Sequence, residues 1–463
     1  GVDPNFPPDI NPDEMQAQQL TQTLFNLPSL ALPPLGVLAA LLLGYILLVG
    51  PVLYFVLRRF DRQAWAWVAI PVLTVLFSAA TYGYGLRIRG DDVILNQISV
   101  VQPYGDRARA RTYAGIFSPA SRAYDVAVDG DALTRPLQFD PRTWGRETGQ
   151  SPSGGQYFQG GGGVRNLRVS QWAMSTFAAE AIVPFERIEA QLELGDNVLR
   201  GTVRNGGTAT LRDAAVVQGG QAFLVGNLAP GEEKPVDMRL DDSVLPGGAP
   251  LSMTIFKDRW NQNMAPPPEL RIPIQIIDSL YGFSPWSRSP TPVLLGWLDH
   301  SPLRLQLSDG RVQHQELTLV EVPIELTYGE TVTFGRGWTR AVFQTGPFQQ
   351  GGCMTQWGQG AMLMSSEPFT ATLELPPAAR TLDITAVELF AEVEGPPPGR
   401  LLVETYDWQA GTWTRQSESF GPIELSEPAR FVRGGELRLR LTPDVSGIQG
   451  SCMHVGASIR GTR

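Results

Sequence analysis

Residues 35–57, LGVLAALLLGYILLVGPVLYFVL, and residues 64–86, AWAWVAIPVLTVLFSAATYGYGL, decide the architecture of this chain. Neither run contains a charged residue, and each is long enough to cross roughly 30 Å of hydrocarbon as a helix. The segment between them, residues 58–63 (RRFDRQ), is short and basic. The sequence therefore predicts a two-helix transmembrane hairpin over residues 35–86.

The charges on either side of the hairpin predict its orientation. The turn carries three arginines, whereas the segment before the hairpin has no Lys or Arg and contains four carboxylates: Asp3, Asp9, Asp13 and Glu14. Because cytoplasmic loops are enriched in Lys and Arg, we expect the turn in the cytoplasm and both chain ends outside. About four-fifths of the chain would then be extracytoplasmic. Since residue 1 is Gly and not Met, we also expect a piece of a longer chain, with a processed precursor as the alternative.

Small and aromatic residues in the hairpin predict how its helices pack. Gly36, Ala40 and Gly44 recur every four residues and leave a groove that another helix can approach, and the second span is the expected partner. Aromatic residues flank the second run in the pattern of interface belts: Trp65, Trp67, Tyr82 and Tyr84. No ionisable residue lies at membrane depth, so we expect an anchor or docking surface and no ion or proton path.

The composition predicts a mainly β protein with several domains. The 49 Gly and 38 Pro are spread along the chain, as in proteins with many short strands and turns. The part after the hairpin is too long for one hydrophobic core, so two or three domains are expected. The net charge of −9 argues against binding to nucleic acid and against adhesion to an anionic lipid surface.

We expect β-sandwich domains held outside the membrane by the hairpin. A helix starting near Asn11 is expected to lie at the membrane interface, with packing against the protein's own outer domain as the alternative. The expected regions are a stub (1–34), the hairpin (35–86), a first β-rich region (87–184), an immunoglobulin-like sandwich (185–265), a linker and mixed region without a domain assignment (266–334) and a C-terminal jelly-roll-like sandwich (335–463).

Three motifs in residues 201–232 carry a resemblance to known folds. They are G-x-V-x-N at 201–205, L-x-D-x-x-V at 211–216 and L-A-P-G-E at 228–232. This segment resembles the immunoglobulin-like β-sandwiches that are common in bacterial surface proteins. The resemblance implies a fold and no particular activity.

The last domain resembles the jelly-roll sandwiches of carbohydrate-binding modules. Residues 437–441 (LRLRL) alternate as a half-buried strand does, and residues 401–414 predict a hairpin whose tip carries aromatic side chains. A glycan is therefore one possible ligand. The only two cysteines, Cys353 and Cys452, lie near the two ends of this domain, and outside the membrane we expect a disulfide between them. In a reducing compartment they would be free thiols.

The sequence predicts no catalytic, cofactor-binding or metal-binding residues. The histidines His300, His314 and His454 are far apart, and Asp299-His300-Ser301 is expected to be a loop because triad residues come from distant segments. Asp91-Asp92 lacks the alternating oxygen ligands of a calcium loop. A carboxylate pair of a glycosidase is the remaining enzymatic possibility, although solvated strand-edge residues are expected: Glu388, Glu392, Glu394 and Glu404.

The order of the parts is similar to that of uncharacterised bacterial envelope proteins, in which a hairpin containing GPVLYFVLRR, here residues 50–59, precedes β-sandwich modules. This resemblance implies a two-pass protein of the bacterial cell membrane. The primary hypothesis is a non-enzymatic scaffold that binds protein or glycan outside the cell. The alternatives are an accessory subunit of a larger membrane complex, docked through the hairpin, and a glycan-active enzyme. The partners expected are the lipid bilayer and membrane proteins, with a glycan as a further candidate, and no nucleic acid or cofactor is expected.

Overall fold

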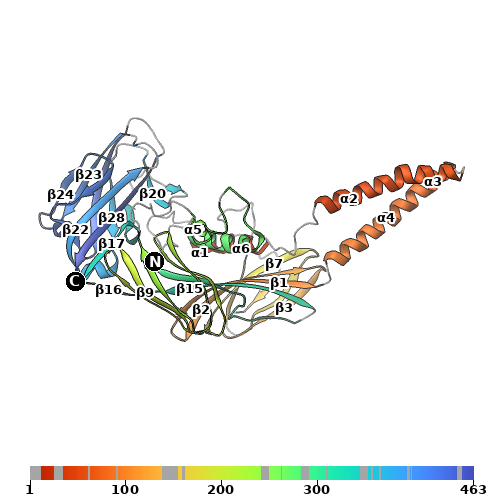
Figure 1. Ribbon diagram of the computed structural model, residues 1–463, viewed down its shortest axis with the longest axis horizontal. Coiled ribbons are helices and arrows are strands. Elements are labelled where there is room, and N and C mark those ends of the chain that lie inside the picture. The colour runs from red at the N-terminus through yellow and green to blue at the C-terminus, as the bar shows by residue number, and fades with distance from the viewer. Residues whose placement is uncertain are drawn as a thin grey trace.

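The computed structural model describes residues 12–25, 35–60, 63–89, 92–137, 155–158, 162–240, 250–261, 263–282, 291–308, 311–344, 353–355, 358–363, 367–393, 397, 399–445 and 451–463. Strands hold 53% of the described residues. Within the described residues they form several separate sheets, which Figure 1 shows as two β bodies with a helical hairpin projecting from one of them. The prediction of a mainly β protein is confirmed.

An eight-stranded sheet, here the central sheet, organises the first body. Its strands in spatial order are β11 (Gln221–Leu228), β10 (Leu211–Gln218), β13 (Val293–Leu298), β15 (Val312–Pro323), β1 (Val93–Tyr104), β2 (Arg107–Ser118), β7 (Ala173–Pro184) and β4 (Leu133–Pro136). All neighbours are antiparallel except β1 and β15, which pair in parallel from Val93 opposite Val312.

The pairing of β1 with β15 changes the expected domain division. It joins the predicted region 87–184 to the predicted region 266–334, and β13 pairs with β10 from the region 185–265. The three regions therefore form one body instead of separate units. Sequence patterns missed this because parallel pairing between distant segments leaves no local signal.

Two four-stranded sheets cover one face of the central sheet. One contains β12 (Glu233–Arg239), β9 (Val198–Asn205), β8 (Ile188–Leu194) and β16 (Glu325–Tyr328); the other contains β14 (Leu305–Leu307), β3 (Arg122–Val128), β6 (Val164–Val169) and β5 (Gln156–Tyr157). In β10, Ala214 and Val216 pack toward the first of these sheets, whereas Ala215 and Val217 pack toward helices on the opposite face. Both faces are buried, so a strand such as β13 is apolar throughout.

Helices cover the other face of the central sheet: α1 (Pro12–Phe25), α5 (Leu251–Ile255), α6 (Pro268–Ile277) and the π-helical turn η4 (Asp278–Gly282). The helix expected at the membrane interface is α1, and the structure shows the packed alternative. Leu20 and Leu24 are fully buried, and Asn96 Nδ2 donates to the Leu24 carbonyl at 3.0 Å. Burial of each leucine stabilises this docking by about 1.5–3 kcal/mol. Asn11 lies outside the described residues.

The second body is a sandwich of two sheets. One has the order β19 (Cys353–Thr355), β20 (Gly358–Leu363), β28 (Ser451–Thr462), β22 (Asp383–Val393), β25 (Gly421–Glu424), with β17 (Thr331–Phe334) also on β28. The other has the order β18 (Arg340–Gln344), β21 (Phe369–Glu374), β27 (Glu436–Val445), β23 (Gly399–Asp407), β24 (Thr412–Ser417), with β26 (Val432–Arg433) also on β27. Short 3-10 turns, η6 (Arg336–Trp338), η7 (Pro377–Thr381) and η8 (Pro428–Arg430), connect the strands.

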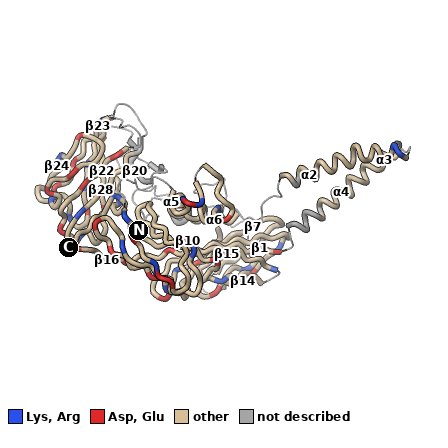
Figure 2. Tube along the Cα trace, viewed as in Figure 1, with Lys and Arg blue, Asp and Glu red and all other residues tan. Residues whose placement is uncertain are grey.

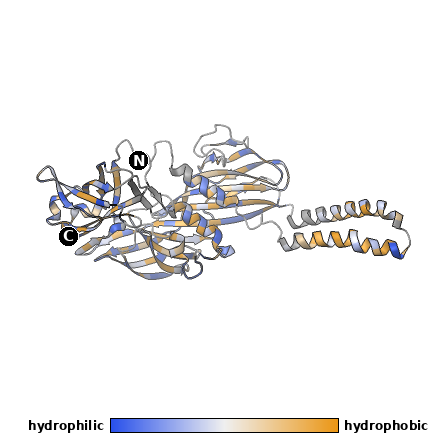
Figure 3. Cartoon of the chain, turned by 90° about the horizontal axis from the view of Figure 1, so that it is seen from above, coloured by the Kyte–Doolittle hydropathy of each residue, from blue (hydrophilic) through white to orange (hydrophobic). Residues whose placement is uncertain are grey.

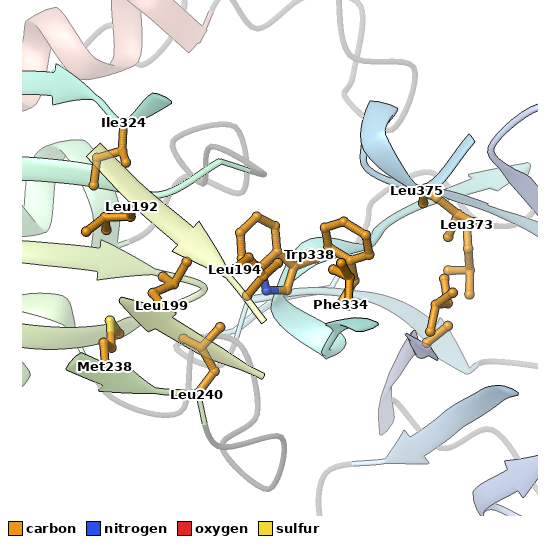
Figure 4. Close-up of a cluster of buried hydrophobic side chains, with 14 of the residues drawn as sticks. Leu192, Leu194, Leu199, Met238, Leu240, Ile324, Phe334, Trp338, Leu373 and Leu375 are labelled. Atoms are coloured by element: carbon orange, nitrogen blue, oxygen red, sulfur yellow. The ribbon is translucent and has the colours of Figure 1, made fainter. Parts of the chain in front are cut away.

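One hydrophobic core runs from the first body into this C-terminal sandwich (Figure 4). Phe334 and Trp338, 0% and 2% exposed, lie between Leu194 of β8 and Leu373 of β21. The rings of Phe334 and Trp338 meet edge to face with centroids 5.4 Å apart. The two bodies therefore share buried apolar surface at the point where the chain passes between them.

The helical hairpin consists of α2 (Leu35–Leu47), the π-helical turn η2 (Leu48–Val52), α3 (Leu53–Arg59), the 3-10 turn η3 (Gln63–Trp65) and α4 (Ala66–Arg89). Gly50 and Pro51 lie in the π-helical turn, which accommodates the missing proline N–H. The helix α4 continues through Pro71. Figures 1 and 3 both show the two arms side by side, pointing away from the first body.

Candidate functional site

The hairpin is the part of the described structure with the largest exposed apolar surface. Figure 3 shows hydrophobic residues along both arms. Large side chains on every side of the arms are exposed, including Leu43 at 59%, Phe55 at 64% and Trp67 at 89%. A contiguous apolar surface of this extent marks a membrane or protein contact. Among the described residues, one helix, Ala39–Arg59, is long and apolar enough to cross a membrane, and Ala66–Thr81 is a shorter apolar helix.

Contacts between the arms come from a row centred on Tyr45. Its hydroxyl lies 3.0 Å from Thr74 Oγ1, and its ring lies 5.1 Å from the ring of Phe77. Thr74 Oγ1 in turn donates to the Ile70 carbonyl at 2.8 Å. The hydroxyl groups of Tyr45 and Thr74 therefore have partners within the hairpin.

The small-residue row does not face the second arm, so that part of the sequence prediction is wrong. Gly36, Ala40 and Gly44 are exposed, and an added Cβ at either glycine would meet nothing within 4 Å. The half-buried positions are instead Leu41 and Tyr45, which lie about a quarter turn around the helix. The bulk of Tyr45 and Phe77 sets the spacing of the arms, and the row remains open on another face.

The tip of the hairpin is basic and aromatic. Arg58 and Arg59 end α3, and Figure 2 shows basic residues at the tip of the hairpin. Trp65 and Trp67 are exposed beside them, at 57% and 89%. The side chains of Tyr82 and Tyr84, the predicted belt at the other end, lie outside the described residues.

A second surface is the outer face of β23, β24 and β27 in the C-terminal sandwich. The predicted aromatic hairpin is present as β23 and β24, and Tyr406 meets Trp408 and Trp413 edge to face at 5.0 and 5.3 Å. Arg438 lies over the ring of Trp408 at 4.6 Å, and Arg440 over the ring of Trp413 at 5.1 Å. Because guanidinium groups occupy these ring faces, the array is not an open platform for stacking a sugar.

Asp407 anchors the turn below this array. It accepts hydrogen bonds from the backbone N–H groups of Ala410 at 3.0 Å and Gln409 at 2.8 Å, and from Arg430 at 2.5 Å. The Ala410 N–H, then the Gln409 N–H and the Arg430 guanidinium, hold the pKa of Asp407 below its ordinary value. All of these groups stabilise the turn between β23 and β24, so the aromatic and arginine side chains above it have a structural role.

The candidate glycosidase carboxylates are engaged with arginines or lie apart. Glu392 forms a two-point ion pair with Arg336, with both distances 3.0 Å, and Glu404 forms one with Arg440 at 2.6 and 2.7 Å. Glu388 lies opposite Glu424 on β25. Glu394 lies outside the described residues. Of the three described candidates, Glu392 and Glu404 therefore each have an arginine partner.

The remaining polar motifs, Asp299-His300-Ser301 and Asp91-Asp92, contain side chains that bond to neighbouring elements of the fold. Asp299 pairs with Arg212, and Ser301 Oγ lies 2.8 Å from Ser99 Oγ, so the Asp299-His300-Ser301 segment is the loop expected from the sequence. Asp92 accepts from Gln313 at 3.0 Å, and Asp91 lies outside the described residues. Within the part of the chain that the structure describes, no three His, Cys, Asp or Glu side chains are grouped to hold a metal ion.

One cluster of polar side chains, formed by Glu321, Tyr281 and Gln102, was not predicted from the sequence. Glu321 of β15 accepts from the Tyr281 hydroxyl of η4 and from Gln102 Nε2 of β1 at 2.8 Å. Burial, followed by the charge of Glu321, raises the pKa of Tyr281 well above its ordinary value. The three residues come from distant segments. Tyr281 and Gln102 both donate hydrogen bonds to the carboxylate of Glu321, and these bonds join the helical layer to the central sheet.

Cys353 and Cys452 lie on β19 and β28, the strands on either side of β20. Cys353 is opposite Gly360 and Cys452 is opposite Met362. Their side chains lie outside the described residues, so the disulfide stays a prediction. We expect non-reducing peptide mass spectrometry of protein purified without reductant to show the linked peptide, because an oxidising compartment favours the bond. Two thiols that both alkylate in the folded protein would contradict it.

Two family models match the chain, each described as a domain of unknown function. DUF8725 matches residues 187–327, and DUF8815 matches residues 342–461. The first range contains β8 to β15 and most of β16, and so includes β13 and β15, which lie in the region 266–334 that the sequence left without a domain assignment. The second range lies within the C-terminal sandwich. No protein in the curated collection matches the chain.

Several solved structures share weak similarity. The yeast delta-COP-I mu-homology domain complexed with a Dsl1 WxWxV peptide is 7% identical, with 52% of this chain and 98% of that chain covered and a TM-score of 0.24. The Fcho1 mu homology domain from Danio rerio with a bound Eps15 peptide is 10% identical, with 51% of this chain and 97% of that chain covered and a TM-score of 0.23. Allantoicase from Saccharomyces cerevisiae is 9% identical, with 76% of this chain and 77% of that chain covered and a TM-score of 0.17. Similarity at these TM-scores assigns neither fold nor function.

Proposed function

We propose that this protein is a non-enzymatic scaffold of the bacterial cell envelope, anchored by a two-pass hairpin and holding its two β bodies outside the membrane. The observation that carries the proposal is the exposed apolar surface of both arms, with Leu43 at 59% and Phe55 at 64% exposed. Such surface is unfavourable in water by about 25 cal/mol per Å² and is neutral in lipid. The arginines at Arg58 and Arg59 favour a cytoplasmic tip.

The lengths of the arms support two crossings. The first arm runs over residues 35–59 and the second over residues 66–89. At about 1.5 Å of rise per residue, each spans roughly 36 Å, which exceeds the hydrocarbon thickness of about 30 Å. The second arm precedes Val93 at the start of β1, and α1, the described helix before the first arm, ends beside Asn96 of the same strand.

A deletion tests the anchor directly. Joining Phe25 to Asp92 through a Gly-Ser linker removes the hairpin but keeps α1, whose Leu20 and Leu24 are buried in the first body. We expect the full chain to remain in membranes after an alkaline carbonate wash and the deleted chain to move entirely to the soluble fraction. Circular dichroism and thermal unfolding of the soluble product provide the control for folding. Carbonate release of the full chain would contradict the anchor.

A second candidate function is that of an accessory subunit in a larger membrane complex. The open row of Gly36, Ala40 and Gly44 supports it, because close backbone approach at small residues is a main source of attraction between helices in lipid. Gly44→Leu should then release co-purifying membrane proteins. Leu43→Ala is the matched control, since it removes bulk from the neighbouring position. Unchanged co-purification with Gly44→Leu would exclude docking through this row.

A further inference from the structure

The end of the central sheet nearest the hairpin lies close to the chain's exit from the arms. The helix α4 ends at Arg89 and β1 begins at Val93. Four residues of extended chain reach at most about 14 Å. Figure 1 shows this end of β1, together with β7, beside the base of the hairpin. The proposed anchor therefore fixes the distance between this sheet end and the bilayer.

The strand register brings one tryptophan to the same end. Ile94 of β1 lies opposite Phe117 of β2, and Phe117 lies opposite Met174 of β7. Trp172 precedes β7, and its backbone N–H donates to the Ser118 carbonyl at 2.9 Å. With strands about 4.8 Å apart, the Trp172 backbone is about 10 Å from β1.

The backbone of Trp172 is strained. Its φ angle is +59°, in the left-handed region that a bulky side chain rarely adopts and that costs about 1–2 kcal/mol. The indole is half-buried and lies against Phe117, with ring centroids 6.1 Å apart. Together with Ile94 and Met174 these rings form a small apolar cluster, which Met174 links to the core beneath the helical layer. A strained residue that presents a large amphipathic ring at one sheet end indicates a function for that ring.

Charged residues lie on the segments at this sheet end. Exposed arginines belong to them: Arg122 begins β3 and pairs with Val169, Arg168 lies two residues before the Ser170 turn, and the Arg311 carbonyl accepts from the Val93 N–H. Asp92, next to Val93, adds a carboxylate at the same end, so that both signs of a zwitterionic headgroup find a counterpart. Guanidinium groups bind lipid phosphates, and tryptophan prefers the zone between the headgroups and the acyl chains.

We propose that Trp172 is a second membrane contact, with its indole in the headgroup zone of the outer leaflet. This inference rests on the proposed anchor and extends it to the orientation of the first body. Two contacts, the base of the hairpin and the Trp172 turn, would fix how the central sheet is tilted over the bilayer. A hairpin alone would set where the body is attached to the bilayer but not how it is tilted.

The test uses the full chain labelled with 5-fluorotryptophan in phosphatidylcholine nanodiscs. The fluorine resonance of Trp172 is assigned by its loss in Trp172→Asn, since asparagine tolerates the left-handed conformation, and independently in Trp172→Phe. Trp67 and Trp408, assigned by their own phenylalanine variants, are the internal controls. A nitroxide on the lipid headgroup should broaden the Trp172 and Trp67 resonances at least twofold and leave Trp408, in the distant C-terminal sandwich, sharp.

The controls separate the failure of this inference from failure of the anchor. A broadened Trp67 with a sharp Trp172 would mean that the hairpin is in the bilayer and that Trp172 only covers Phe117. Sharp resonances for both residues would contradict the anchor itself, and with it the inference. Broadening of Trp408 together with Trp172 would show that the label is not specific to the sheet end, and would also overturn the assignment.

Discussion

Phe334→Ala should destabilise the protein by about 3–5 kcal/mol and give the C-terminal sandwich an unfolding transition of its own. Phe334 is fully buried, and its ring lies 5.9 Å from Tyr328 and 5.4 Å from Trp338, in the core shared by the two bodies (Figure 4). Its removal leaves a cavity where the bodies meet. Denaturant unfolding of the hairpin-deleted chain, followed by calorimetry, measures both effects.

Tyr104→Ala is the matched control, because Tyr104 is 52% exposed at the end of β1 and lies outside the shared core. It should change the free energy of unfolding by less than about 0.5 kcal/mol. If Phe334→Ala cost no more than Tyr104→Ala, the two bodies would not be coupled through this core.

Glu392→Ala should destabilise the C-terminal sandwich by about 2–3 kcal/mol. The guanidinium of Arg336 is 11% exposed, is held by Glu392 at two points of 3.0 Å and lies 3.4 Å from the centre of the Phe390 ring. Without Glu392, a mostly buried positive charge loses its counterion. The partial exposure of Glu392, at 30%, keeps the expected loss below that of a fully buried pair. Thermal unfolding of the hairpin-deleted chain, with and without Glu392→Ala, measures this loss of stability.

Glu388→Ala provides the comparison on the same strand. Glu388 lies directly opposite Glu424, so its removal relieves a like-charge contact and should leave stability unchanged or slightly higher. Equal losses for the two variants would show that the Arg336 ion pair contributes nothing beyond the side chain itself.

The sequence carried the parts of the fold that depend on local pattern. The motif at residues 201–205 lies in β9 (Val198–Asn205) and the motif at residues 211–216 lies in β10 (Leu211–Gln218), so both belong to strands as a β-sandwich requires. Residues 437–441 lie within β27 as predicted. The two apolar runs also became helices, since a long uncharged run leaves few other ways to satisfy the backbone.

The parts that sequence reasoning missed depend on distant pairing. Nothing local indicates that Val93 pairs in parallel with Val312, so the body was divided into three regions. The burial of α1 was not predicted for the same reason. Its apolar face is modest, and whether it packs against the protein or lies at a membrane interface depends on the central sheet, which is formed by distant segments. Trp172 was missed because its backbone strain cannot be read from a side-chain pattern.

The central claim is that the hairpin tip lies in the cytoplasm and both β bodies lie outside. A single cysteine at Gln63, in the turn, and another at Gln409, on the exposed turn between β23 and β24, test it with a membrane-impermeant thiol reagent in intact cells, with the unsubstituted chain as the background control. The cysteine at position 409 should react in intact cells, and the one at position 63 only after the cells are opened. The reverse pattern would contradict the topology.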